Sequence, residues 1–434
     1  MEKTCLPPLG QLAWMAIIMS VSSIRAEEAP TSPQDLASVL PHVKLVNETK
    51  IEGRVVRRYE HDSAEVWGYA APQNDYFYVV PARAPAEKAP LRVVLHSAGH
   101  SGDNVLKEAF EHHDQFHYYS DETAHVLYLD CAQHRDVDWW WGHHAIKRTP
   151  ERYASALFPT EQRVLATIEW VIKQYEADRN RVYLSGISMG GSGSLGIGLR
   201  RGDLFAAISV AVPAGVEHMT FRMADGKHPD PPPLINISSH VDRWSKDQEK
   251  LLSYFEKNRF FLVFAWGPFG HKADVSSVNP AVYEYPWLSI RKDEAYPVFS
   301  HATTDQRYPG HNNKTAPDQE GQINGYFRWK TIEDTTHAFV MELRLVKKDE
   351  LKRPIELPQE AVADITPRRL QNFVIQNGAG YLWSMTRTEK TLQSGRATAD
   401  AGGVLTIPAV AISDTPAHLR IVPDTQTTAP PPRS

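Results

Sequence analysis

Cysteine is nearly absent from this chain, with two residues, Cys5 and Cys131, among 434. One possible pair excludes the class of small disulfide-rich domains, so packing must supply the stability. The chain also has no excess of basic residues, as its formal net charge of -5 shows. This argues against nucleic acid as a partner. Hydrophobic residues make up 42% of the chain, which is ample for a sizeable core.

The first 26 residues resemble an export signal. Lys3 precedes the apolar stretch 9–21, and the small residue Ala26 precedes an acidic, proline-bearing segment. The apolar stretch is short for a membrane span, so we expect cleavage and no integral membrane span afterwards. The alternative is an N-terminal anchor that stays attached. The expected location is secreted or periplasmic.

A rhythm of short apolar runs begins near residue 91. Such runs are expected of strands buried on both faces of a sheet. Helical stretches such as 159–175, with apolar residues three or four apart, lie between several of them. Strands that alternate with helices predict an α/β domain with a doubly wound, mostly parallel sheet over residues 30–300. The runs are 91–95, 126–129, 182–184, 207–212, 234–237 and 260–264.

The composition changes near residue 300. Residues 301–322 are polar and rich in proline, glycine and asparagine, which predicts a linker. Beyond it, strands are expected without intervening helices, and this pattern predicts a small all-β sandwich over 323–424. The tail 425–434 is expected to be disordered. The predicted strands are 323–330, 337–346, 369–376, 381–387 and 404–412.

The pentapeptide Gly186-Ile187-Ser188-Met189-Gly190 follows an apolar strand and precedes a run compatible with a helix. In that context the G-x-S-x-G pattern predicts a nucleophilic serine on a sharp strand-to-helix turn. Side chains at the two glycine positions would collide with the neighbouring structure. A glycine-rich loop with a chance serine is the alternative, and the flanking strand and helix argue against it.

An activated serine needs a base and a group that orients the base. On a parallel sheet both groups come from loops at the carboxyl ends of other strands. Asp242 is the first carboxylate after the strand 234–237, and His271 follows the strand 260–264 on a glycine-rich loop. The chain order Ser188, Asp242, His271 is the one expected for this arrangement. The competing acids lie in a predicted helix or after the histidine: Asp247, Glu249 and Asp274.

An oxyanion needs two N–H donors close to the nucleophile. The residue after the serine, Met189, is expected to supply one. The other is expected from the loop that follows strand 91–95, with Ala98 as first choice and Ser97 next. His96 in the same loop is expected to support the loop rather than to carry a proton.

The chain resembles secreted α/β-hydrolase esterases in three runs: DRNRVYLSGISMGG at 178–191, LHSAGH at 95–100 and GPFGH at 267–271. Feruloyl esterases, acetylxylan esterases and polyhydroxybutyrate depolymerases share this pattern, and the resemblance covers roughly residues 85–275. It implies an α/β-hydrolase fold with the serine, acid and histidine on Ser188, Asp242 and His271. Two departures are Ser97, where the family usually has glycine, and an acid loop that reads His-Val-Asp without glycine.

Aromatic residues lie near several of the predicted strand ends. Trp139, Trp140 and Trp141 are consecutive, so they cannot all point inward from one strand or helix. We interpret them as a platform that stacks on sugar rings or phenolic acids, and the alternative is a hydrophobic plug under a long loop. Trp244 and Trp266 are expected near the acid and the histidine, as further substrate-binding residues.

A histidine cluster, His112, His113 and His117 with Asp114, could suggest a metal site. No distant set of further ligands accompanies it, so we interpret it as a solvated helix end. Serine hydrolase chemistry needs no metal and no cofactor, and none is expected.

These observations predict a serine carboxylic-ester hydrolase that forms an acyl-enzyme. The expected substrates are acetyl or feruloyl esters of polysaccharides, because export and the tryptophan-rich loop favour a glycan polymer. A polyester depolymerase or a serine peptidase of the same fold would use the same residues. A catalytically inactive carbohydrate-binding or scaffold protein is the alternative from a different class.

Overall fold

The computed structural model describes residues 43–62, 67, 69, 74–83, 87–111, 118, 121–132, 139–141, 157–216, 230–271 and 277–424. The predicted export signal, the C-terminal tail and the histidine cluster at 112–117 lie outside the described residues. Among the helices of the described ranges, none combines the length and the apolar character that a membrane crossing requires.

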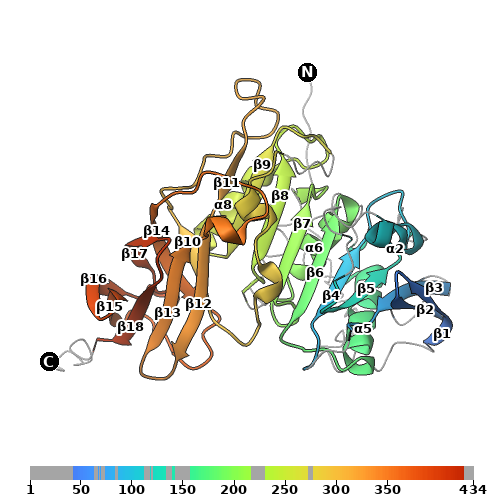
Figure 1. The fold of residues 1–434 in the computed structure, drawn as a ribbon, viewed down its shortest axis with the longest axis horizontal. Coiled ribbons are helices and arrows are strands. Elements are labelled where there is room, and N and C mark those ends of the chain that lie inside the picture. The colour runs from blue at the N-terminus through green and yellow to red at the C-terminus, as the bar shows by residue number, and fades with distance from the viewer. Residues whose placement is uncertain are drawn as a thin grey trace, which may run out of the picture.

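A mixed ten-stranded sheet forms the first unit, with its strands coloured from blue to yellow in Figure 1 except for the orange edge strand β11 (Gly321–Ile323). In spatial order it contains β1 (Lys44–Ile51), β2 (Arg54–Asp62), β3 (Asn74–Val80), β5 (His125–Leu129), β4 (Leu91–Leu95), β6 (Val182–Ile187), β7 (Ala207–Ala211), β8 (Leu234–Ser239), β9 (Leu262–Gly267) and β11 (Gly321–Ile323). The six strands from β5 to β9 run parallel. Strands β1 to β3 and β11 are antiparallel to their neighbours and form the two edges.

Helices cover both faces of this sheet because successive strand residues point to opposite sides. Val93 of β4 belongs to the core under one helical layer, and the next residue, Val94, belongs to a core on the other side. The first layer contains α5 (Pro159–Gln174), α6 (Met189–Gly198) and α8 (Gln248–Asn258). The opposite face carries α2 (Gly102–Glu111), α9 (Pro280–Tyr283) and the short helix η3 (Trp287–Ser289). The expected doubly wound α/β architecture is confirmed.

The C-terminal unit consists of two antiparallel sheets that share one hydrophobic core, drawn in orange to red in Figure 1. One sheet contains β10 (Tyr296–Ser300), β14 (Glu360–Arg368) and β17 (Ile407–Ser413). The other contains β12 (Phe327–Asp334), β13 (Phe339–Leu345), β18 (Ala417–Pro423), β15 (Gly380–Arg387) and β16 (Lys390–Thr398). A short helix, η4 (Lys348–Glu350), follows β13. The all-β second unit agrees with the sequence pattern.

The strand predicted at 369–376 is wrong. Arg369 has a positive φ of 54°, which turns the chain away from the extended conformation. The backbone N–H groups of Gln371, Asn372 and Phe373 then donate to the carboxylate of Asp334 instead of to a neighbouring strand. The segment is therefore a loop that Asp334 organises.

The two units exchange strands across the predicted boundary at residue 300. Strand β10 precedes the boundary but pairs with β14 of the sandwich, whereas β11 follows it and pairs with β9 of the first sheet. The intervening segment 301–320 is held against the first unit. Its Asn312 N–H donates to the His240 carbonyl at 2.7 Å, and the His240 ring lies 3.0 Å from the Pro317 carbonyl oxygen. The polar composition of this segment therefore does not make it a free linker, because hydrogen bonds attach it to the first unit.

Candidate active site

Ser188 lies on a strained turn between β6 and α6. Its φ of 56° and ψ of -117° are unusual for a residue with a side chain, and such strain costs about 1–3 kcal/mol. A Cβ on Gly190 would overlap the Leu95 carbonyl, and one on Gly186 would overlap the backbone of Gly190. Only glycine fits at both positions, so the sharp turn of the G-x-S-x-G pattern is present.

Three predicted side chains meet at the carboxyl end of the sheet. The Ser188 hydroxyl lies 2.7 Å from His271 Nε2, and His271 Nδ1 lies 2.7 Å from Asp242 Oδ2. Because a carboxylate only accepts, Nδ1 carries the proton and Nε2 is left to accept from the serine. Asp242 is 1% exposed, whereas the His271 side chain is 29% exposed at the surface of the site.

Two strand-end loops hold the acid and the base. Asp242 Oδ1 accepts from the Trp244 N–H at 2.9 Å, which leaves Oδ2 for the histidine. Ser239, the last residue of β8, accepts from the Gly270 N–H through its hydroxyl at 2.8 Å. Its carbonyl accepts from the Asp242 N–H at 3.1 Å. Sequence reasoning missed Ser239, although its place at the end of a strand and before Asp242 was a usable signal.

The three N–H groups predicted to bind an oxyanion differ in whether they already have an acceptor. Within the described residues, the N–H groups of Met189 and Ala98 have no acceptor, and Ala98 is exposed. Met189 also opens helix α6, whose dipole favours negative charge at that end. The Ser97 N–H already donates to the Tyr118 hydroxyl at 3.1 Å. Ser97 is therefore a wrong prediction as a donor, because its N–H group is not available.

The loop that carries Ala98 is braced from behind by His96. The ring accepts from the Cys131 N–H through Nε2 at 2.9 Å, and Nδ1 lies 2.9 Å from the Ser97 carbonyl oxygen. Burial lowers the pKa of His96, and a neutral ring with its proton on Nδ1 satisfies both contacts. An ion pair with Asp130, whose oxygen lies 3.6 Å from Nε2, does not fit that neutral ring. His96 supports the loop, as its position suggested.

The tryptophan platform is wrong for Trp140 and Trp141, which are both 0% exposed. A Cβ on Gly193 would lie 2.7 Å from the Trp140 Cβ, and one on Gly196 would overlap the Trp141 ring. The Trp140 indole N–H donates to the His96 carbonyl, and that of Trp141 donates to the Ser192 hydroxyl. Trp140 therefore packs between helix α6 and the loop after β4, and Trp141 packs against α6.

The remaining predicted tryptophans have three different environments. Trp139 is half-buried and packs against the core, with a φ of 46°. Trp266 is 0% exposed, stacks on Phe264 and meets the edge of Tyr308, so its prediction as a substrate contact is wrong. Trp244 is 50% exposed and adjoins the acid loop. Among the Phe, Tyr and Trp residues that the structure describes, it is the one that is exposed.

No protein-family model matches this sequence, and neither does the sequence of any curated protein. Solved structures show distant similarity over about half of the chain. An S-formylglutathione hydrolase from Agrobacterium tumefaciens aligns with a TM-score of 0.40 and 16% identity, over 53% of this chain and 93% of the other. An acetyl xylan esterase from Aspergillus awamori aligns with a TM-score of 0.31 and 14% identity, over 40% and 70%. The fold assignment rests on the strand order described above.

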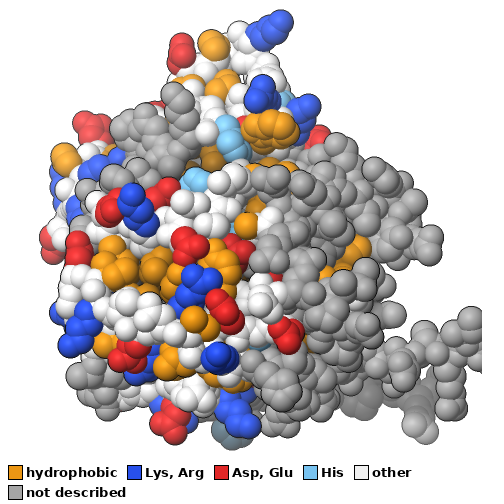
Figure 2. Space-filling model, turned by 90° about the vertical axis from the view of Figure 1, so that its right-hand side faces the viewer, with side chains coloured by type: hydrophobic (Ala, Val, Ile, Leu, Met, Phe, Trp, Pro, Cys, Tyr) orange, Lys and Arg blue, Asp and Glu red, His pale blue; other side chains and the backbone are white. Residues whose placement is uncertain are grey.

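On the face seen in Figure 2, acidic and basic side chains are interspersed among hydrophobic ones, in keeping with the modest net charge of -5. Among the described residues, no three His, Cys, Asp or Glu side chains form a group that could hold a metal ion. The side chains that meet at Ser188 are suited to nucleophilic attack with proton transfer.

Proposed function

We propose that this protein is a serine carboxylic-ester hydrolase. The observation that carries the proposal is the continuous relay from Asp242 through His271 to Ser188, with both links at 2.7 Å. The relay ends on a serine held at the N-terminus of α6. A chance contact would not also place two N–H groups without acceptors, those of Met189 and Ala98, on the two loops beside it.

The proposed reaction begins when the Ser188 oxygen attacks the ester carbonyl carbon and its proton passes to His271 Nε2. Asp242 stabilises the resulting imidazolium, and the N–H groups of Met189 and Ala98 donate to the oxyanion. Collapse of this intermediate breaks the bond to the alcohol, which leaves with the proton from His271. Water then attacks the acyl-enzyme with His271 as base, which releases the acid and restores Ser188.

For the substrate we propose acetyl or feruloyl esters on a polysaccharide, met by an exported protein. The support is Trp244, whose exposed ring adjoins the acid loop, where the alcohol part of an ester could stack on it. The Arg243 guanidinium lies 4.9 Å from the centre of that ring, so it holds the ring in place from one face.

Hydrolysis of p-nitrophenyl acetate and of acetylated or feruloylated xylan tests the proposal. We expect Ser188→Ala to lower kcat by at least ~10⁴-fold, because removal of the nucleophile abolishes the acyl-enzyme. Ser394→Ala, on the exposed part of β16, is the matched control and should retain full turnover. Absence of turnover in the wild type, or equal turnover in Ser188→Ala, contradicts the esterase. Cleavage of a peptide panel without ester cleavage would identify a serine peptidase instead.

A further inference from the structure

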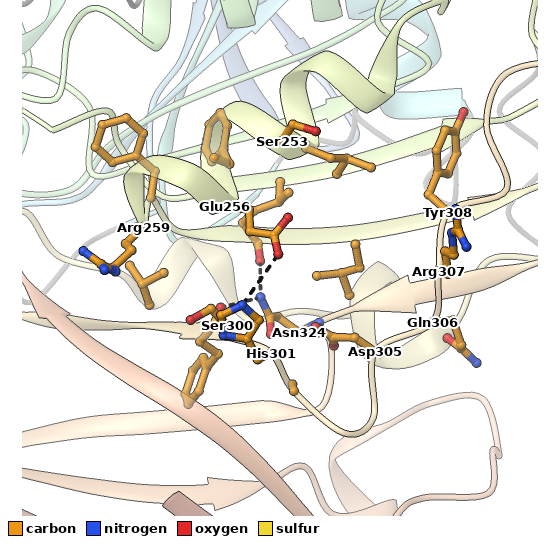
Figure 3. Close-up of a pocket in the computed structure, with 18 of the residues that line it drawn as sticks. Ser253, Glu256, Arg259, Ser300, His301, Asp305, Gln306, Arg307, Tyr308 and Asn324 are labelled. Atoms are coloured by element: carbon orange, nitrogen blue, oxygen red, sulfur yellow. Dashed lines mark hydrogen bonds and ion pairs between the residues drawn. The ribbon is translucent and has the colours of Figure 1, made fainter. Parts of the chain in front are cut away.

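A cavity of about 570 Å³ lies where α8 meets the segment that joins the two units (Figure 3). Its lining comes from both units, with residues of α8 and β9 on one side and of β10, β11 and 301–308 on the other. None of Ser188, Asp242 and His271 lines it. The volume falls within the range of about 300–1,000 Å³ that is common for small-molecule sites.

Two polar side chains are fixed in this cavity, and Figure 3 shows them next to each other. The Asn324 amide nitrogen donates to the Leu262 carbonyl and to the Phe299 carbonyl, each at 3.0 Å, and so ties β9 to β10. The backbone N–H of Asn324 donates to Asp305 Oδ1 at 2.8 Å. Asn324 is only 5% exposed, and its side-chain oxygen has no partner among the described residues. A buried amide oxygen in that state favours a ligand that brings a donor.

The charges around the cavity are balanced and mostly paired. Arg259 lies 3.0 Å from Asp400, and His301 lies 2.9 Å from Asp364. Glu249 accepts from the His311 N–H at 2.7 Å. Figure 3 shows Glu256 facing His301 from α8, with their nearest atoms 3.9 Å apart. With three carboxyl groups set against two guanidinium groups and a histidine, the cavity does not call for an ion of either sign.

The walls between these groups are apolar. Side chains from both units provide flat or branched surfaces beside the polar floor, which suits the C–H faces of a sugar ring. They are Leu252, Phe255, Phe260, Leu262, Val298 and Ile323. A ligand that fits must therefore be neutral, rich in hydroxyl donors and partly apolar.

We propose that this cavity binds a neutral saccharide unit, with its hydroxyl groups on Asp305 and the Asn324 oxygen and its ring against the apolar walls. The site lies apart from the Ser188 chemistry, so it goes beyond the proposed esterase and does not depend on it. Burial raises the pKa of Asp305 to about 7, and a protonated Asp305 can donate to a sugar oxygen as well as accept. For an exported esterase of polysaccharides, such a subsite would hold the polymer while the acyl group is cut.

Titration calorimetry with the Ser188→Ala protein tests this site without any turnover. The probes are xylotetraose, cellotetraose and mannotetraose as neutral ligands, trigalacturonate as an anion and tetraglucosamine as a cation. We expect millimolar or tighter binding of at least one neutral tetrasaccharide and no binding of the two charged probes. If no neutral probe binds at 10 mM, or if only a charged probe binds, the proposal is overturned.

Further substitutions, each made in the Ser188→Ala protein, test whether the saccharide binds in this cavity. Asp305→Ala removes an acceptor from the floor, and Ser253→Trp fills the cavity from an exposed position on α8, so each should weaken binding at least tenfold. Asp318→Ala, on the exposed part of the same joining segment, should leave binding unchanged. Thermal unfolding shows whether each variant is folded. Unchanged binding in folded Ser253→Trp contradicts the proposal, and an inactive wild-type esterase would not.

Discussion

Two segments that contain tryptophans lie close to Ser188, and their side chains differ in exposure to solvent. Trp140 and Trp141 are sealed inside, behind helix α6, whereas Trp244 stands 50% exposed beside the acid. Both segments follow strands at the same edge of the sheet, so their positions in the chain suggested the same role. The difference comes from the surface of helix α6, against which the buried rings pack. Gly193 and Gly196, three residues apart on α6, leave space that the two buried rings fill.

This difference teaches that proximity to Ser188 in the fold does not decide whether a tryptophan is buried or exposed. The buried pair holds helix α6 and the loop after β4 through the Ser192 hydroxyl and the His96 carbonyl. The exposed ring is free to meet a substrate. Glycines in a neighbouring helix decide which of the two occurs, because each missing side chain opens room for one ring.

The largest expected effect separates the two fates directly. Trp141→Ala should lower the free energy of unfolding by about 3–5 kcal/mol, because a fully buried ring leaves a cavity and the Ser192 hydroxyl loses its donor. Trp244→Ala is the matched control and should change stability by less than about 0.5 kcal/mol. Urea unfolding measures both. Equal losses in the two variants would break the comparison.

A smaller loss of stability is expected when Gly196, which packs against the Trp141 ring, is substituted. Gly196→Ala should destabilise the protein by about 1–3 kcal/mol, because the new methyl group overlaps the Trp141 ring. The double variant Gly196→Ala with Trp141→Phe should recover part of this loss, since the smaller ring gives room. Urea midpoints for the single and double variants provide the readout, and additive losses would show that the two residues do not share one contact.

The role of the exposed Trp244 can be tested by enzyme kinetics. Trp244→Ala is expected to lower kcat/KM about tenfold on acylated xylan through a higher KM, because a stacking surface is lost. Turnover of p-nitrophenyl acetate, which has no sugar, should change less than twofold. Arg243→Gln, which keeps the ring and removes the charge beside it, separates stacking from charge. Equal losses on both substrates would mean that Trp244 acts through Asp242 and not through the glycan.

A further expected effect concerns pH and the segment 301–320, which rests on the acid loop. The pKa of Asp305 rises from an ordinary 3.8 to about 7 through burial, opposed by the Asn324 N–H and assisted by Glu256 on α8. The folded state binds this proton more tightly, so the resulting stability is full below about pH 4 and is lost as the pH rises through 7. Asp305→Asn should remove that decline. Urea midpoints at pH 4.5 and 8 test it, and parallel profiles for both proteins would contradict it.

Local patterns predicted the parts of the molecule that depend on local geometry. The apolar runs marked the parallel strands because burial on both faces demands apolar residues throughout. The glycines at 186 and 190 marked the turn because close backbone approach excludes any side chain there. The order of Ser188, Asp242 and His271 followed from the rule that strand ends meet at one edge of the sheet.

The failures share a different cause. Ser97 loses its N–H to a tyrosine hydroxyl from a later segment, and the strand at 369–376 is diverted by Asp334 from a distant strand. The sequence pattern also contained no sign that β10 and β11, on either side of residue 300, each pair with the other unit. Each outcome depends on a partner far away in the chain, which no local window contains.

The amino-acid sequence by itself determined the alternation of strands and helices, the sharp turn at Ser188 and the two residues that follow it in the relay. These features depend on short-range steric contacts and on hydrophobic periodicity, both of which are set by residues close together in the sequence. The tertiary structure alone decided which tryptophans are buried, that Ser239 links the acid and histidine loops, and that a cavity forms between the units. Burial and pairing across long chain separations are properties of the assembled surfaces, so they exist only once the chain has folded.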